Sequence, residues 1–272
     1  MKYLFLFLSL NLFSIPHYYV SSADMRFFGK LTNLIRTIKK NDYKNLAEIL
    51  VFDLGMSQGQ KKLLESMDKV VVKKIDLVHS DLLKYFNTGL GRNVRGWFAW
   101  KPVAIKRALE RYPYILYLDA GMQVLRPLDW LFEYIEQEGY FLVDAESRID
   151  NRITKQVLEN LVYKMDNYKE QILTKNMNCA GIQGLSGKMV TNYVDPVYDC
   201  VKNITLFADD GTSQLGFGSA RHDQTLFSVY ARSLGLKMFQ PGWNSITMNG
   251  EKIDFHIHWD IGQLNEDSSI YY

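Results

Sequence analysis

Acidic residues stand at the ends of two predicted strands. The apolar run Ile115–Leu118 leads into Asp119, and the stretch Ile49–Leu54 contains Asp53 directly after its own apolar run. Continuous apolarity predicts strands buried on both faces, as in a largely parallel sheet with helices on each side. Because open α/β sheets bind ligands beyond the carboxyl ends of their strands, both acids are candidates for ligand contact. The alternative for Asp119 is that its side chain only caps a tight turn.

The last predicted strand, residues 252–260, is the second place where spacing suggests chemistry. Its apolar residues alternate strictly with ionisable ones, which are Asp254, His256, His258 and Asp260. Side chains two residues apart on a strand point the same way, so His256 and His258 could reach one metal ion or phosphate together. The alternative is an edge strand with a solvated polar face.

The elements that must position these residues follow a β–α pattern. Strands are predicted at 17–22, 49–54, 70–75, 115–118, 140–143 and 178–186, and helices at 27–38, 57–67, 81–86, 102–109, 128–135, 152–172, 188–201 and 221–234. Asp24 and Ser57 are predicted helix caps, and residues 208–219 a mobile loop. No repeat or linker divides the chain, so residues 17–272 are predicted to form a single domain.

Composition excludes some functions and leaves others open. With 32 basic and 30 acidic residues interleaved along 272 positions, the chain has no basic stripe, so nucleic acid is not an expected partner. Its two cysteines, Cys179 and Cys200, could form one disulfide but no framework. The spacings of dinucleotide fingerprints, P-loops, nucleophile elbows and zinc helices are not met.

The amino terminus has the pattern of a targeting segment. Residues 3–15 are mostly apolar and end at Pro16, so residues 1–16 are predicted to be a signal peptide or a weak signal-anchor with weak membrane association. Ser21-Ser22-Ala23 fits a signal-peptidase site but also lies in the first predicted strand. We therefore expect the segment to be kept, or removed before His17, in a protein of the secretory pathway or another extracytoplasmic space, secreted or membrane-associated.

Four short motifs, taken in order, resemble a known enzyme family. They are Val20–Ala23, Phe52–Gly55, Trp100–Pro102 and Tyr117–Gly121. Together they resemble the VSSA, YDLG, WKP and YLDAG motifs of uncharacterised glycosyltransferase-like proteins with the GT-A fold. More loosely, the chain is similar to glycogenin-like transferases. The resemblance implies an α/β, Rossmann-like fold with a mostly parallel central sheet, helices on both faces and a nucleotide-sugar donor.

The resemblance also implies roles for particular residues. Those expected at the donor are Ser21, Ser22, Asp53, Lys101, Asp119, Gly121, Asn178, Gly181 and Gln183. Asp223 is the candidate to contact the acceptor hydroxyl and, in an inverting reaction, to act as general base. Asp209 and Asp210 remain alternatives for the base.

The sequence departs from the family at its metal motif. Such transferases carry Asp-x-Asp, and Gly121 replaces the second acid here. If Mn²⁺ or Mg²⁺ binds, Asp119 with His256 or His258 is the expected ligand set. If neither binds, Lys101 and Arg221 are the expected cations beside the diphosphate.

The function expected is hexosyltransferase-like transfer from a nucleotide-diphosphate sugar, with a UDP-sugar as the expected donor. The acceptor hydroxyl could belong to a glycan, a protein or a lipid. A catalytically inactive nucleotide-sugar or carbohydrate-binding relative is an alternative, because the missing acid is one that such a protein would lose. A sugar nucleotidyltransferase is a further alternative, although residues 21–26 lack the Gly-rich basic loop such an enzyme needs.

Overall fold

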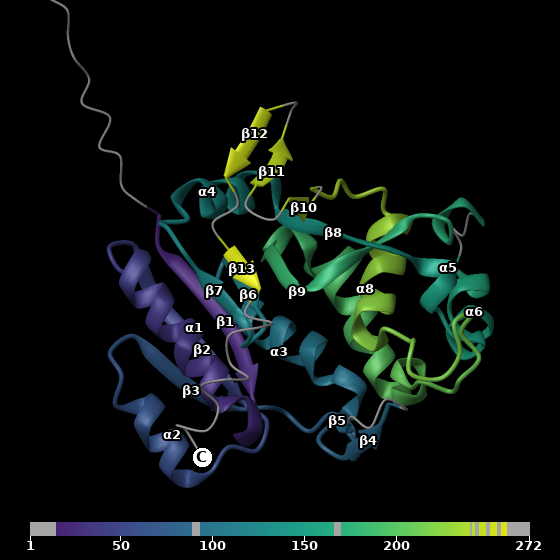
Figure 1. Cartoon of the computed structure of the whole chain (residues 1–272), viewed down its shortest axis with the longest axis horizontal. Helices are drawn as coiled ribbons and strands as arrows, with labels where there is room; N and C mark the ends of the chain where they lie inside the picture. Colours follow the sequence, from purple (N-terminus) through teal and green to yellow (C-terminus); the bar gives the residue numbers. More distant parts are fainter. Residues whose placement is uncertain are drawn as a thin grey trace, which may run out of the picture.

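The structure is a computed structural model that describes residues 15–88, 93–165 and 170–239, and the backbone of short strands at 241–242, 245–248, 251–254 and 257–259. Its centre is a six-stranded sheet with the order β3-β2-β1-β6-β9-β8 (Figure 1). The strands are β1 (His17–Ala23), β2 (Leu46–Asp53), β3 (Val70–Lys74), β6 (Tyr114–Leu118), β8 (Tyr140–Arg148) and β9 (Asn176–Ser186). Pairs β3–β2, β2–β1 and β1–β6 are parallel, and β9 runs antiparallel to both its neighbours. The predicted mostly parallel sheet is therefore confirmed.

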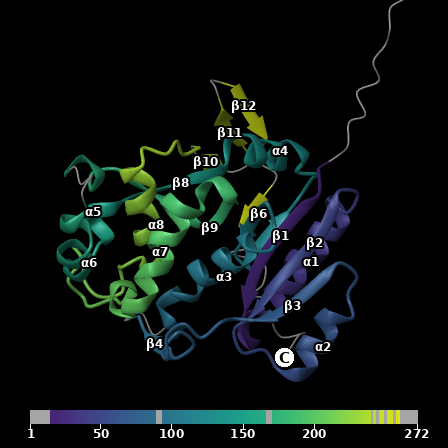
Figure 2. The same cartoon turned by 180° about the vertical axis from the view of Figure 1, so that it is seen from behind.

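Helices cover both faces of this sheet, as continuous apolarity predicts. The helices are α1 (Phe28–Asn41), α2 (Gln58–Glu65), α3 (Trp100–Leu109), α4 (Asp129–Glu138), α7 (Asp195–Asp199) and α8 (His222–Ser233). Alternate residues of β1 enter two cores: Tyr19 packs with α1 and α4, whereas Val20 packs with α3 and α8. Figure 2 shows the fold from behind, with α8 beside β9. Burial on both faces explains why these strands read as uninterrupted apolar runs.

Short polar sequences set where the helices begin. Asp24 accepts hydrogen bonds from the backbone N–H groups of Arg26 and Phe27 at the turn before α1. Ser57 forms a capping box with Gln60 at the start of α2. Both predicted caps are confirmed, and they place the β–α turns at the edge of the sheet where β1 and β2 end.

Smaller elements complete the fold. They are α5 (Ile149–Arg152), α6 (Lys155–Asn160), β4 (Tyr85–Asn87), β5 (Asn93–Arg95), β7 (Met122–Val124), β10 (Pro241–Gly242), β11 (Ser245–Met248), β12 (Glu251–Asp254), β13 (Ile257–Trp259) and several short 3₁₀ or π turns. The hairpin β4–β5 lies where β1 ends, since its Tyr85 and Arg95 contact Asp24, whereas β7 runs beside α1 and pairs with β13. Among the described residues, none of the helices is both long enough and apolar enough to cross a membrane.

Four predicted elements differ from the structure. Residues 81–86 form turns and strand β4, not a helix, because so short a segment gains few helical hydrogen bonds. The predicted helices at 152–172 and 188–201 are broken into short pieces, and Val190–Val194 is π-helical. The predicted last strand is two strands in different sheets, β12 beside β11 and β13 beside β7. Alternation in the sequence cannot show that a strand changes partner part-way along.

Candidate functional site

Asp119 lies directly after central strand β6, as predicted. Its backbone N–H donates to the carbonyl of Gly181 at 2.8 Å, and its own carbonyl accepts from Met122 at 2.9 Å. The side chain is 35% exposed, so one part of it faces solvent. Its Oδ1 accepts a hydrogen bond from the Tyr117 hydroxyl at 2.9 Å and lies 3.0 Å from the Lys101 ammonium. Both of these contacts with described residues fall on Oδ1, so Oδ2 is the oxygen better placed to receive a ligand hydroxyl.

Lys101 lies between two carboxylates. Its Nζ is 3.0 Å from Asp119 Oδ1 and 3.1 Å from Asp223 Oδ2, and it donates to the carbonyl of Ala180 at 3.3 Å. The side chain is only 4% exposed. Burial acts to lower the pKa of Lys101, but the two carboxylates outweigh it and hold that pKa above its usual range. Lys101 is therefore a fixed cation that joins α3 to β6 and α8.

The backbone before Lys101 is tightly constrained. Gly96, Trp97 and Phe98 all have positive φ, at 50°, 46° and 64°. At Gly96 a Cβ atom would lie 2.1 Å from the carbonyl oxygen of Leu82, so only glycine fits. This turn starts α3 and directs Lys101 beneath the end of the sheet. The sequence predicted a helix at residues 102–109, but the strained turn before it, which positions Lys101, could not be predicted from the sequence pattern.

Asp223 lies in the first turn of α8, with its side chain 6% exposed against Lys101. Burial is the main reason that its pKa rises to about 6; Lys101 acts to lower that pKa and Asp119 to raise it. A carboxylate with this pKa is ionised at neutral pH yet basic enough to accept a proton from a hydroxyl in a transition state. The predicted pair Asp119 and Asp223 is thus brought together, with Lys101 as the bridge.

Asp53 forms a turn at the end of β2. Its Oδ1 accepts from the N–H groups of Gly55 and Met56, at 2.8 and 2.7 Å, and its Oδ2 lies 3.3 Å from the ammonium of Lys61. This is the turn-capping role that Asp often has at strand ends. A contact between Asp53 and the base or ribose stays a prediction.

Ser21 and Ser22 both lie in β1 at the same edge. They are 1% and 5% exposed and point to opposite faces of the sheet. Ser22 lies on the face of Tyr117, near the phenol that holds Asp119. Ser21 is on the α1 face, where its hydroxyl has no hydrogen-bond partner among the described residues. The structure thus brings Ser22, not Ser21, to the side of Lys101.

Asn178 and Gln183 are completely buried in β9. The Tyr193 hydroxyl donates to Gln183 Oε1 at 2.8 Å and receives a hydrogen bond from Asn178 Nδ2 at 3.2 Å. Ser228 of α8 donates to Asn178 Oδ1 at 2.7 Å. This network joins β9 to α8. It engages side-chain atoms of Asn178 and Gln183, two residues that were expected to contact the donor. Of the predicted β9 residues, Gly181 lies at the site, where its carbonyl receives the Asp119 N–H.

The alternative bases, Asp209 and Asp210, organise a loop instead of joining the cluster. Asp209 accepts from the N–H groups of Gly211 and Gly218, at 3.1 and 2.7 Å. Asp210 accepts from both the N–H and the hydroxyl of Thr212. The loop expected to be mobile is thus tied by internal hydrogen bonds. Arg221, at the start of α8, is exposed.

The described residues do not form a metal site: no group of three His, Cys, Asp or Glu side chains among them could hold an ion. Asp119 has the Lys101 ammonium as neighbour, and the residue two positions on is Gly121. His256 and the His258 side chain lie outside the described residues, so their role stays a prediction. The backbone of His258 pairs with Gln123 in β7, just beyond the Asp119 turn.

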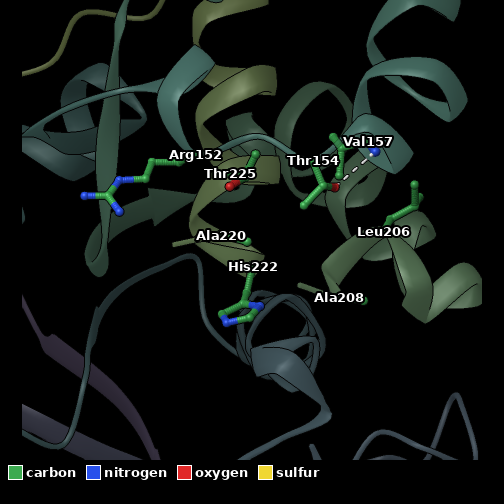
Figure 3. A pocket seen from close by; sticks show the side chains of 8 residues that line it. All are labelled: Arg152, Thr154, Val157, Leu206, Ala208, Ala220, His222 and Thr225. Carbon is green, nitrogen blue, oxygen red and sulfur yellow. Dashed lines mark hydrogen bonds between the residues drawn. The ribbon is translucent and has the colours of Figure 1, made fainter. Parts of the chain in front are cut away.

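A small recess, partly open to solvent, lies beside the start of α8 (Figure 3). It is lined by Arg152, Thr154, Val157, Leu206, Ala208, Ala220, His222 and Thr225. His222 has φ of 46°, and its Nδ1 lies 2.7 Å from the carbonyl oxygen of Phe207. Burial is the main cause of its lowered pKa. None of the residues predicted for the site lines this recess.

Both cysteines, Cys179 and Cys200, are free thiols.

Sequence reasoning missed a second charged cluster at the same edge. Asp24, predicted only as a helix cap, also contacts the side chains of Arg26, Tyr85 and Arg95. The only signal available was that Arg26 closely follows a strand end. Arg95 is 71 residues from Asp24, and a local pattern cannot show such a contact.

No protein-family model and no curated protein matches the sequence. Several solved glycosyltransferase structures resemble the fold. Core-mannan synthase A (CmsA/Ktr4) from Aspergillus fumigatus, in an Mn/GDP form, has TM-score 0.51 and 11% identity, covering 87% of this chain and 75% of that one. The mannosyltransferase Ktr4p from S. cerevisiae, in complex with GDP, has TM-score 0.50 and 9% identity, covering 82% and 69%.

The bifunctional glycosyltransferase WbbM has TM-score 0.46 and 14% identity, and it covers 83% of this chain; the chain spans only 38% of WbbM. At these identities the comparisons show the fold alone. Together with the mixed sheet and its helical layers, the likeness to the two Ktr4 structures establishes a GT-A fold.

Proposed function

We propose that this protein is a glycosyltransferase that moves a sugar from a nucleotide-diphosphate donor to an acceptor hydroxyl. The observation that carries the proposal is the cluster of Lys101, Asp119 and Asp223 at the carboxyl end of the central strand of a GT-A fold. Ligands of open α/β sheets bind in this position. An inactive relative would have no need for two carboxylates held on one buried cation, which costs desolvation energy to assemble.

The exposure of the two acids supports different roles for them. Asp119, whose side chain is 35% exposed, is suited to accept a hydroxyl of the donor ribose or sugar. Asp223 lies deeper and has a pKa of about 6, which suits a group that contacts the acceptor hydroxyl. Lys101 fixes the distance between them and offsets one of their two negative charges. In an inverting reaction Asp223 would take the proton of the acceptor hydroxyl as the new glycosidic bond forms.

Lys101 is a poor substitute for a metal ion beside the diphosphate. Its ammonium is already shared by two carboxylates, so the cluster as a whole has an excess of one negative charge when both acids are ionised. One of the two solved Ktr4 structures is an Mn/GDP form and the other is a complex with GDP. A nucleoside diphosphate is therefore a suitable ligand to test, and donor trials must include GDP-sugars beside the expected UDP-sugars, with and without Mn²⁺.

We place the protein in the secretory pathway or another extracytoplasmic space, on the pattern of residues 1–16. Residues 1–14 lie outside the described part of the chain. β1 (His17–Ala23) is an interior, buried strand of the sheet, so cleavage after Ala23 would remove a central element. Mass spectrometry of the native protein would test this: a mature terminus at Asp24 in an active enzyme would contradict the proposed role of β1.

The decisive experiment is nucleotide release from a panel of UDP- and GDP-sugars, measured with Mn²⁺, Mg²⁺ or EDTA. We expect turnover of one donor by the wild type and none by the Asp119→Asn variant. The matched control is Asp195→Asn, since Asp195 is 37% exposed and ion-paired with Lys106 but belongs to α7. Equal turnover by both variants would remove Asp119 from the site. Binding of a nucleotide sugar without any turnover would favour the inactive relative.

A further inference from the structure

A second charged cluster lies where β1 ends. Asp24 Oδ2 lies 3.2 Å from Arg26 Nη2 and 3.1 Å from Arg95 Nε, and it accepts a hydrogen bond from the Tyr85 hydroxyl at 2.9 Å. The guanidinium carbons of Arg26 and Arg95 lie 4.4 and 4.1 Å from the centre of the Tyr85 ring. Tyr85 and Arg95 are opposite each other in the β4–β5 hairpin, so the hairpin places both side chains beside Asp24.

The cluster has one positive charge in excess. Burial acts to raise the pKa of Asp24, but hydrogen bonds from Tyr85 and Arg95 and the charge of Arg26 outweigh it and hold that pKa below its usual value. The ionised carboxylate offsets one of the two guanidinium groups. The Asp24 side chain is 3% exposed, whereas Arg26 is 42% and Arg95 19% exposed. The excess charge is therefore on the accessible side of the cluster.

This charge lies at the same edge of the sheet as Asp119. Asp24 follows Ala23, which pairs with Asp53 at the end of β2. In the register between β1 and β6, Val20 pairs with Tyr117, so Ser22 stands level with Asp119 and Asp24 lies just beyond it. Arg95 also packs on the turn after β2: a Cβ at Gly55 would lie 2.8 Å from Arg95 Nη2.

The chemistry of a nucleoside diphosphate requires positive charge at this edge. The Lys101 ammonium is a poor source of it, since two carboxylates already share that ammonium. Guanidinium groups match phosphate oxygens in charge and in planar, bidentate geometry. Arg26 is 42% exposed, while Asp24, the ring of Tyr85 and the backbone carbonyl of Asn93, which lies 3.2 Å from Nη1, hold its position.

We propose that Arg26, supported by Arg95, binds the diphosphate group of the nucleotide donor. This inference rests on the proposed glycosyltransferase function and assigns the anion-binding part of its donor site. The opposing interpretation is that the cluster only fastens the hairpin to β1. The two differ in one observable: a phosphate-binding arginine discriminates between a nucleoside and its diphosphate, whereas a structural one does not.

The test is titration calorimetry of UDP and GDP, and of uridine and guanosine, against the full chain in EDTA. For Arg26→Gln we expect diphosphate affinity to fall about ten- to 100-fold, the range for a lost hydrogen bond to a charged group. Nucleoside affinity and melting temperature should be unchanged, because Tyr85 and Arg95 still hold Asp24. The loss should also shrink as salt rises.

The matched control is Arg111→Gln. Arg111 is 43% exposed, pairs with Glu48 at 2.9 Å and lies 5.3 Å from the Tyr112 ring, but it belongs to the opposite, amino-terminal edge of the sheet. If Arg26→Gln binds diphosphates as well as Arg111→Gln does, or loses nucleoside and diphosphate alike, the cluster is a structural one. If the wild type binds a nucleoside diphosphate with Mn²⁺ but not in EDTA, this inference fails and the proposed function stands. If it binds none under either condition, both fail.

Discussion

Lys101 and Asp24 each lie between two groups of opposite charge, at one edge of one sheet, but with reversed signs. Lys101 is shared by Asp119 and Asp223, and it is buried. Asp24 is shared by Arg26 and Arg95, and the Arg26 side chain is 42% exposed. One cluster thus has a negative excess and the other a positive excess. A donor with a neutral, hydroxyl-rich sugar at one end and an anionic diphosphate in its middle could use both.

Burial decides what each cluster can do. Desolvating Lys101 and Asp223 is costly, and it fixes their geometry and raises the pKa of Asp223 instead of leaving a charge free for a ligand. Arg26, which is 42% exposed, is less strongly fixed but remains available to a ligand. The difference suggests that the Lys101 cluster positions the substrate-contacting acids, whereas the Asp24 cluster binds the anion. Four substitutions can test this division of roles.

The largest effect is expected for Lys101→Met. Removing the cation leaves two carboxylates facing each other, one of them buried, and breaking such a buried pair costs about 3–5 kcal/mol. Denaturant unfolding should show this loss of stability, and the further change Asp223→Asn should recover part of it. Lys106→Met in the same helix is the control, since that lysine is 20% exposed and should cost about 1 kcal/mol or less. A stable Lys101→Met protein would mean that the cluster is not a structural unit.

Asp119→Asn is expected to act on turnover alone. The amide keeps the shape of the side chain and can still accept from Tyr117, but it loses the charge that the ligand meets. We expect kcat/KM to fall at least about 100-fold, as when one transition-state contact is removed, with an unchanged unfolding midpoint. A fall in stability as large as that of Lys101→Met would show that the exposed acid, too, is structural.

The sequence was sufficient to predict the parts of this edge that depend on local pattern. Asp119 at a strand end and the caps Asp24 and Ser57 follow from neighbouring residues, and all three are confirmed. The contacts of Lys101 depend on three elements that come together in the fold. The Asp24 cluster depends on a hairpin whose Arg95 is 71 residues from Asp24 in the sequence. Neither set of long-range contacts produces a residue spacing that could be recognised in the sequence.

The β9 residues show the opposite problem. Asn178 and Gln183 have the composition of a ligand-facing strand, but an antiparallel strand between β6 and β8 has both faces covered. Their amides bond to Tyr193 and Ser228 instead of facing solvent. Polar residues in a strand therefore predict hydrogen bonding more safely than ligand contact.

The raised pKa of Asp223 leads us to expect opposite pH trends for activity and for stability. If it acts as a base, kcat/KM should fall about tenfold per pH unit below about pH 6, where the carboxylate becomes protonated. Its folded-state pKa lies above the unfolded value of about 3.9. The stability it contributes is therefore present below about pH 4 and is lost as pH rises through about 6. Asp223→Asn should remove both trends, and pH-dependent unfolding together with pH–rate profiles would check them. A rate limb that survives in Asp223→Asn would assign the base elsewhere.

The smallest change in stability is expected for Gly121→Asp, which restores the missing second acid. Among the described residues, a Cβ at Gly121 would meet only Lys30 Cδ, at 3.9 Å, and the residue does not have a positive φ. The new side chain should therefore cost less than about 0.5 kcal/mol, as surface substitutions do. A second carboxylate two residues from Asp119 should create or strengthen Mn²⁺ binding, measurable by calorimetry without any substrate.

Gly121→Asn is the matched control, since it has the same shape without the charge. Mn²⁺ affinity that rises in Gly121→Asp but not in Gly121→Asn would show that the negative Lys101 cluster needs only one more acid to hold a metal ion. If neither variant gains affinity, the Lys101 ammonium beside Asp119 opposes a divalent cation more strongly than one carboxylate can offset. The donor's charge would then have to be met from the Arg26 side of the edge, with or without the second acid.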